Sequence, residues 1–244
     1  MRHKTPKLTA FSLLAALMTS TFPHASAQNH PASALRWGEG QPGCTFSADD
    51  DGRYRYGLWT DDLGITVAVD AQELQNSLRR VEPLFAVWIT VRYRGTGSVS
   101  LTPDVILLEF VKHEHAVERS LDPQHLNARL QSNSDTFTEK TRREIQKHPE
   151  KKSGEESLMQ SHLQNVRETQ EIVKSHSLPA AALDPAHAEA GGWVFFNARS
   201  RWVGDWKRQE EFVLRIPAGN RVFEFPFALP PSEGDLLLRH RPQN

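Results

Sequence analysis

The strongest constraint on the fold is a regular alternation of apolar and other residues in the first half of the chain. The alternating apolar residues are Phe85, Val87, Ile89, Val91 and Tyr93. This spacing is the period of a β-strand that buries one face. Gly95-Thr96-Gly97 supplies turn residues, and Val99 begins a short apolar return. We therefore predict a β-hairpin within residues 83–110.

Similar short apolar runs occur on both sides of this segment. The other predicted strands cover residues 53–58, 65–69, 105–111, 193–196, 212–216 and 223–227. Ala218-Gly219-Asn220 suits a hairpin connection between the last two strands. The pattern does not alternate strand with helix, as a parallel sheet requires, so we predict a mainly β fold. We expect one antiparallel sandwich domain over residues 44–244.

The composition changes abruptly between residues 134 and 178, where charged and helix-forming residues dominate. Two capping-box patterns predict two helices, with a break near residues 148–154. The patterns are Thr136 with Glu139 and Ser153 with Glu156. Apolar residues are few, so we expect a weakly buried helical insertion, followed by a linker over residues 179–192. We also expect the sandwich to fold when a short linker replaces residues 134–186.

The first 27 residues have the pattern of a secretory signal peptide. Three basic residues precede an apolar run at positions 8–18, and Ala25-Ser26-Ala27 forms a small-residue cleavage signal. The run is shorter than the roughly twenty residues that a membrane-spanning helix needs. We therefore predict an exported protein, periplasmic or secreted, without a membrane anchor after cleavage. Its mature chain should begin near Gln28 and have a flexible N-terminus over residues 28–43.

Charge and cysteine content narrow the partners and the source of stability. Removing the three basic residues of the leader changes the formal charge from −1 to −4. This balance does not indicate a nucleic-acid partner. Cys44 is the only cysteine, so the chain cannot form an internal disulfide, and its stability must come from burial.

The strand segments together resemble a known kind of domain. They read FAVWITVRYRGTGSVSLTPDVILLEF, then GGWVFFNARSRW, EEFVLRIP and FEFPFALPP. The set is similar to immunoglobulin-like β-sandwich domains of exported bacterial proteins of unknown function. The resemblance covers residues 44–118 and 190–240 and leaves the helical segment outside. It implies an immunoglobulin-like fold and brings no active site with it.

The sequence does not match the local signatures of common catalytic and binding loops. Gly95-Thr96-Gly97-Ser98 lacks the further glycine of a dinucleotide loop and the Gly-Lys-Ser ending of a phosphate loop. No serine stands in a Gly-x-Ser-x-Gly elbow. The acidic run at 47–52 has Leu58 where a calcium loop needs glutamate, which favours a hairpin turn. A triad dispersed along the chain is left open.

His113-Glu114-His115 is the most suggestive metal motif. On an extended chain, residues two apart project to the same face and could present two imidazoles to one metal. His125 is a candidate third ligand. The alternative is a polar strand end in solvent, and Val117 stands where a zinc-hydrolase helix would need its second histidine.

Two regions are candidates for contact with a partner. Met159 and Leu163 lie on the sparse apolar face of the second predicted helix. Trp202 and Trp206 belong, with Trp193, to the densest aromatic cluster, which could stack on a sugar or a peptide or simply pack in the core.

The features together favour an exported, non-catalytic interaction or structural module of the cell envelope or extracellular space. We expect no cofactor, and the partner would be another envelope or secreted protein. The alternative is a metal-binding protein that uses the His-x-His motif.

Overall fold

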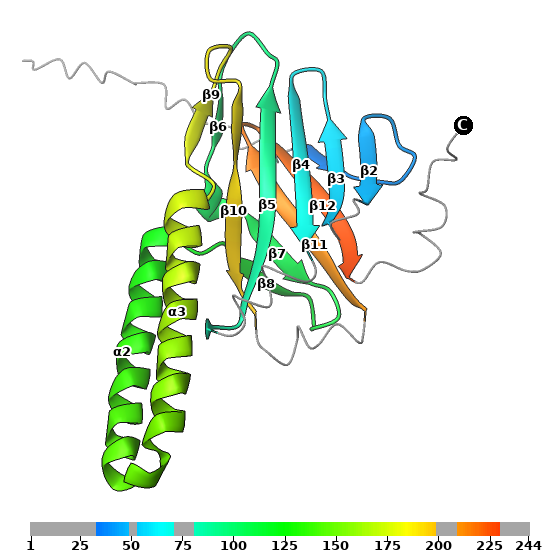
Figure 1. Ribbon diagram of the computed structural model, residues 1–244. Helices are drawn as coiled ribbons and strands as arrows, with labels where there is room; N and C mark the ends of the chain where they lie inside the picture. The colour runs from blue at the N-terminus through cyan, green and yellow to red at the C-terminus, as the bar shows by residue number, and fades with distance from the viewer. Residues whose placement is uncertain (1–32, 49–52, 71–80, 199–208, 230–244) are drawn as a thin grey trace, which may run out of the picture. The chain divides into compact units, whose positions relative to one another are not determined.

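The computed structural model describes residues 33–48, 53–70, 81–198 and 209–229. In this part of the chain the protein is mainly β, with two sheets and two long helices (Figure 1). The fold is consistent with the predicted β-sandwich and helical insertion.

One sheet has five strands, which pair antiparallel throughout. In spatial order they are β10 (Glu189–Asn197), β5 (Leu84–Tyr93), β4 (Leu63–Asp70), β3 (Arg53–Trp59) and β2 (Cys44–Ala48). The predicted strands at 53–58, 65–69 and 193–196 are confirmed within this sheet. The longest strand, β5, lies between β4 and β10.

The other sheet has seven strands. They are β1 (Ser33–Arg36), β6 (Val99–Leu101), β7 (Leu107–Phe110), β8 (Ala116–Arg119), β9 (Ala181–Leu183), β11 (Glu210–Ala218) and β12 (Arg221–Leu229). β12 pairs with β11 on one side, and β6 and β7 pair with different parts of β11 on the other. The short 3-10 helix η1 (Pro103–Val105) separates β6 from β7. The predicted β11–β12 hairpin is confirmed, with Gly219 in its turn at a φ of +61°.

The two sheets share one apolar core. Alternate residues of β5, including Val87, Ile89 and Val91, are fully buried in it, together with Phe212 and Phe225 of the other sheet. The Phe85 and Phe212 rings stack at a centroid distance of 4.9 Å. The alternation predicted for both regions therefore marks the facing layers of the sandwich.

The predicted hairpin within residues 83–110 is wrong. Both edges of β5 are occupied, by β4 and by β10, so the return segment cannot pair with it. β6 instead joins the seven-stranded sheet, where it pairs with β9 and with the end of β11. Residues 94–98 thus carry the chain from one sheet to the other.

An ion pair links the two sheets at this crossing. Arg221, the first residue of β12, donates from Nη1 and Nη2 to the two carboxylate oxygens of Asp62, at 2.7 and 2.8 Å. Asp62 lies in the connection between β3 and β4. The hydrogen bond from Arg221 is the main reason why the pKa of Asp62 is lowered to about 2.

The two predicted helices and the break between them are confirmed, but their starts differ from the prediction. They are α2 (Pro123–Lys147) and α3 (Lys152–His176), separated by the short 3-10 helix η2 (Pro149–Lys151). The side chain of Asp122 caps α2 by accepting from the His125 backbone N–H at 2.8 Å, and Pro123 follows at the first helical position.

The two capping boxes therefore do not start the helices. The Thr136 hydroxyl lies inside α2 and donates to the Ser132 carbonyl at 2.9 Å. Lys151 occupies the N-cap of α3 without a side-chain hydrogen bond, so Ser153 is already helical. The Asp-Pro pair is a stronger start signal than either box, because it combines an N-cap acceptor with a residue that has no backbone N–H to satisfy.

A second, smaller core anchors the hairpin of α2 and α3 to the outer face of the five-stranded sheet. Its buried members are Leu84, Ala86 and Phe195 from the strands, with Leu126, Leu130 and Val173 from the helices. Glu82 adds an ion pair to Arg129 of α2, at 2.9 Å. The first half of β5 is consequently buried on both faces.

Two predicted boundaries also need correction. Part of the predicted N-terminal segment 28–43 has regular structure, because β1 pairs parallel with β12 and Trp37 is buried with its Nε1–H donating to the Thr45 carbonyl at 3.0 Å. The predicted linker at 179–192 contains β9 and the start of β10. Leu178 and Leu183 belong to the main core.

The predicted signal peptide lies outside the described residues. Among the residues that the structure does describe, none of the helices is both long and apolar enough to cross a membrane.

Candidate ligand-binding face

The outer face of the five-stranded sheet carries a row of large side chains beside the helical hairpin. Arg55, Ala68, Trp88 and Trp193 are direct cross-strand partners on β3, β4, β5 and β10. Directly opposite residues project from the same face of a sheet, so the four side chains lie in line. The row thus runs from a guanidinium to a pair of indole rings, with a small alanine between them.

The adjacent row on the same face contains only small or hydroxyl side chains. Its members are Gly57, Thr66, Thr90 and Gly191, which are again cross-strand partners. Because Thr66 and Thr90 stand beside Ala68, the sheet has a low floor between the arginines of β3 and the tryptophans.

A groove of about 390 Å³ occupies this floor. Its lining residues are Arg53, Arg55, Thr66, Ala68, Trp88, Thr90 and Trp193. The volume falls within the range of about 300–1,000 Å³ that is typical of small-molecule sites. Among the side chains that the structure describes, the lining combines aromatic, hydroxyl and guanidinium groups and includes no acidic group.

The geometry of the tryptophans is set by contacts on the sheet. The Trp88 and Trp193 rings meet edge to face, with centroids 5.3 Å apart and planes at 82°. Trp88 Nε1–H donates to the Thr90 hydroxyl at 3.1 Å, which leaves that hydroxyl able to donate its own proton elsewhere. Both indoles are half-buried, so each keeps part of its apolar surface exposed.

A third aromatic side chain borders the floor on the other side. Trp59 lies over Gly64, where a Cβ would come within 2.1 Å of the indole, so only glycine permits this position. The Arg94 guanidinium lies 5.0 Å from the centre of the Trp59 ring, in cation–π contact. Trp59 also lies close to Gly57 and covers that end of the small-residue row.

A second cavity, of about 520 Å³, lies at the base of the hairpin. It is bounded by η1, the start of α2, the end of α3 and β10, and Trp193 lines it as well as the groove. Its walls include Pro103, Pro123 and Pro179. Trp193 therefore connects the anchor of the helices with the open part of the sheet.

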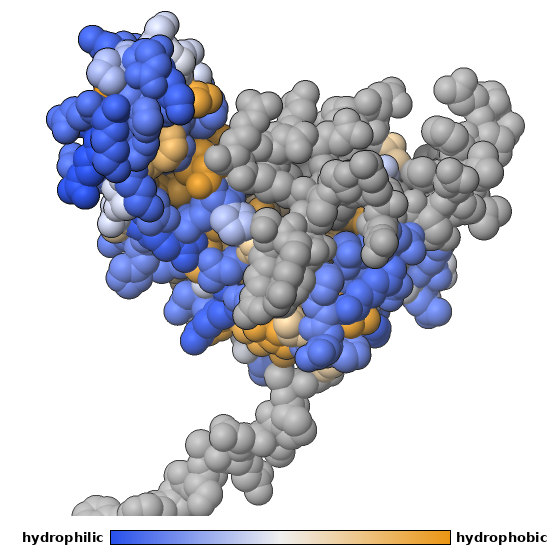
Figure 2. Space-filling model, turned by 90° about the horizontal axis from the view of Figure 1, so that it is seen from below, coloured by the Kyte–Doolittle hydropathy of each residue, from blue (hydrophilic) through white to orange (hydrophobic). Residues whose placement is uncertain are grey.

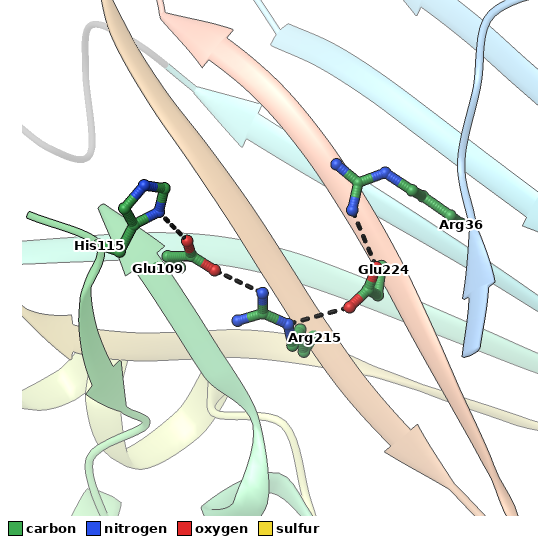
Figure 3. A network of polar contacts seen from close by, with 5 residues as sticks. All are labelled: Arg36, Glu109, His115, Arg215 and Glu224. Carbon is green, nitrogen blue, oxygen red and sulfur yellow. Dashed lines mark hydrogen bonds and ion pairs between the residues drawn. The ribbon is translucent and has the colours of Figure 1, made fainter. Parts of the chain in front are cut away.

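The outer face of the seven-stranded sheet carries a row of alternating charges (Figure 3). His115 Nδ1 lies 2.5 Å from Glu109 Oε1, and Arg215 donates to the other oxygen of Glu109. Arg215 Nε also donates to Glu224 Oε1 at 3.0 Å, and Arg36 Nη1 donates to Glu224 Oε2 at 2.9 Å. The row crosses β7, β11, β12 and β1.

Glu109 is held as an ionised acceptor in this row. Its hydrogen bond with His115 is the largest cause of its lowered pKa, and Arg215 lowers the pKa further, against the effect of burial. Because both carboxylate oxygens have donors, Glu109 has little capacity to act as a general base. The arrangement fits a cross-strand ion ladder that stabilises the sheet.

The predicted metal residues do not come together. His113 and His115 lie in the tight turn between β7 and β8, where Glu114 and His115 both have a φ of 56°, so the expected extended chain is wrong. His113 Nε2 contacts Glu210 at 3.0 Å, whereas His115 contacts Glu109. His125 is 93% exposed on the first turn of α2. Within the described segments, no three His, Cys, Asp or Glu side chains could hold a metal ion.

The predicted partner residues have mixed outcomes. Met159 and Leu163 are half-buried within the hairpin, so part of that apolar face is used inside the protein. Trp202 and Trp206 lie outside the described residues. Trp193 is described, and its aromatic partner is Trp88 of the neighbouring strand.

Sequence reasoning missed the residues that surround Trp193. Trp88 and Thr90 occupy the outward positions of the same alternation that predicted β5, and Arg53 and Arg55 those of β3. The signal was present as a polar or aromatic outward face on each strand. Recognising that these residues meet on one face required the strand order β3-β4-β5-β10, which the sequence did not supply.

Comparison with known proteins finds no family model, no curated protein and no solved structure that matches this chain.

Proposed function

We propose that the protein is an exported, non-catalytic binding module, in which an immunoglobulin-like sandwich carries a helical hairpin as its contact arm. The leader pattern of residues 1–27 supports export to the periplasm or beyond. The partner is another envelope or secreted protein.

The order of the strands supports the immunoglobulin-like part of the proposal. In that fold, two neighbouring strands of one sheet are each followed in the chain by a strand of the other sheet. These two following strands also pair with each other. Here β5 and β10 pair in the five-stranded sheet, and each is followed by a crossing to β6–β7 and to β11, which pair in the other sheet. β12 then pairs with β11 as the last strand.

The main support for a binding role is the exposed position of the helical hairpin. Among the residues that the structure describes, the small core and the Glu82–Arg129 ion pair fasten the base of the hairpin to the sheet. Beyond Thr141 on α2 and before Val166 on α3, the helices contain no buried residue. Figure 2 shows their outward surface as largely hydrophilic, with apolar residues where they meet the sandwich. Two ordered helices that add so little to the core are best explained by contact with another molecule.

Leu158 is the natural place to test this role. It is 62% exposed on α3, near the closed end of the hairpin. A photo-crosslinking amino acid at position 158, expressed in the native host, should form a defined adduct with an envelope or secreted protein. The same amino acid at Val117, which is 51% exposed on β8, is the matched control and should not form that adduct.

A shortened hairpin provides the second arm of the test. Phe137 of α2 and His162 of α3 face each other at a ring distance of 4.2 Å, so a short linker can join the helices there. A chain without residues 138–161 should fold but fail to compete with the full chain for the crosslinked partner. If the shortened chain competes equally, or if only position 117 forms adducts, the hairpin is not the contact arm.

A further inference from the structure

We propose that the groove between Arg53, Arg55 and the Trp88–Trp193 pair binds an acidic saccharide. This site lies on the sheet rather than on the hairpin, and it does not depend on the proposed role of the hairpin.

The position of the groove limits how it can recognise a ligand. Its floor belongs to β4 and β5, which have hydrogen-bonded neighbours on both sides. Their backbone groups are therefore used inside the sheet, and a peptide cannot add here as an extra strand. Recognition must come from side chains that stand up from the face.

Those side chains match the parts of a sugar ring. The half-buried faces of Trp88 and Trp193 offer apolar surface for the C–H groups of a pyranose. Thr66 and Thr90 offer hydroxyls for its hydroxyl groups, and the Thr90 hydroxyl accepts from Trp88 and so keeps its proton for donation.

The charge of the lining selects an acidic sugar. Arg53 and Arg55 both line the groove, and none of the other lining residues that the structure describes is a carboxylate. Each of these arginines also has an interaction within the protein, but a guanidinium has five N–H donors and can serve a second acceptor. A carboxylate or sulfate on the ligand would receive paired, charge-assisted hydrogen bonds from such a group.

The distances across the face suit a ligand of one or two rings. Arg55 and Trp88 are separated by a single residue, Ala68, along the cross-strand row. Adjacent strands lie about 4.8 Å apart, so about 10 Å separates the two backbones. One ring stacked on the tryptophans therefore places its acidic group within reach of the arginine side chains.

The test is titration of the purified protein with acidic and neutral saccharides, followed by tryptophan fluorescence and calorimetry. The probes are trigalacturonate and a heparin disaccharide, with galactotriose as the neutral counterpart and citrate as a non-sugar anion. Binding of an acidic saccharide, weaker at high salt and clearly stronger than that of galactotriose or citrate, is expected. If citrate bound as tightly as the acidic saccharide, the sugar ring would not contribute to recognition. If galactotriose bound as tightly, the arginines would not contribute.

Variants then locate the binding. Arg55→Gln should weaken binding of the acidic saccharide about tenfold while leaving galactotriose unaffected. Trp88→Ala should weaken it at least about thirtyfold, as removal of an aromatic anchor does. Arg143→Gln on α2 is the matched control and should change nothing. Trp88→Phe keeps an aromatic face and should retain most of the binding, whereas Arg55→Gln alone tests the groove if Trp88→Ala does not fold.

Two results would overturn the proposal. One is the absence of binding by both acidic saccharides at millimolar concentration. The other is binding that Arg55→Gln, and Trp88→Ala where it folds, leave unchanged, because the ligand would then occupy another surface.

Discussion

At the scale of single residues, charged groups join elements that are far apart in the sequence. Glu109 and Arg215 connect strands separated by the whole helical hairpin, and Asp62 and Arg221 connect the two sheets. These pairs could not be predicted from the sequence, because the chain contains many arginines that could pair with each carboxylate. The strand order and register determine which arginine lies beside it.

The Asp62–Arg221 pair predicts how stability depends on pH. The pKa of Asp62 is lowered to about 2 in the folded protein, from 3.8. A carboxyl group whose pKa is lower in the folded protein than in the unfolded chain stabilises the fold when the pH is above the unfolded pKa. This contribution should therefore be lost as the pH falls from about 4 to about 2. Thermal unfolding of the native chain and Asp62→Asn should differ near neutral pH and converge near pH 2.

The neighbouring exposed residue provides the control for this measurement. Asp61→Asn should leave the unfolding temperature close to that of the native chain across the same range. A gap between the native chain and Asp62→Asn that stays constant down to pH 2 would contradict the assigned ion pair.

At the scale of elements, β5 organises the molecule because both of its faces are used. Phe85, Val87, Ile89 and Val91 enter the main core, whereas Leu84 and Ala86 enter the smaller core under the helices. The alternation was read correctly from the sequence. The burial of the other face was not predicted, because it depends on helices that are attached only through tertiary contacts.

The central position of Ile89 on β5 yields a stability prediction. Its side chain is fully buried between the sheets, so Ile89→Ala should lower the free energy of unfolding by about 2–5 kcal/mol. Arg92→Ala, on the exposed face of the same strand, removes only a surface ion pair with Glu189 and should cost about 1 kcal/mol or less. Chemical denaturation of both variants checks the difference, and a near-neutral Ile89→Ala would contradict the assigned inward face.

At the scale of the whole molecule, the helical insertion and the sandwich are not independent. The base of the hairpin supplies Leu126, Leu130 and Val173 to a shared core, and the returning chain supplies Leu178 and Leu183 to the main one. Replacing residues 134–186 would remove Val173, both later leucines and β9. These contacts therefore argue against the expectation that the sandwich tolerates this replacement.

Two deletions should separate the essential part of the insertion from the dispensable part. Loss of residues 138–161 removes one buried side chain, Thr141, and should leave a folded protein with a cooperative unfolding transition. Loss of residues 134–186 should give a chain that unfolds at much lower denaturant concentration or fails to fold. Circular dichroism and denaturant titration distinguish them, and equal stability of the two shortened chains would contradict the assigned anchor.

The sequence alone determined the elements that depend on local pattern. Alternation predicted most of the strands, and the composition between residues 134 and 178 predicted two helices with a break at the observed place. Local periodicity suffices for these features, because a strand or helix that faces one core repeats its apolar residues at a fixed spacing.

Only the tertiary structure decided which elements became neighbours. It placed β6 in the sheet opposite β5, paired β1 with β12, and brought Arg55 into line with Trp88 and Trp193. The residues on the outward face of a strand follow no sequence pattern from which their cross-strand partners could be identified. The candidate groove therefore came from strand order and register, which depend on how the two sheets and the hairpin bury their apolar faces together.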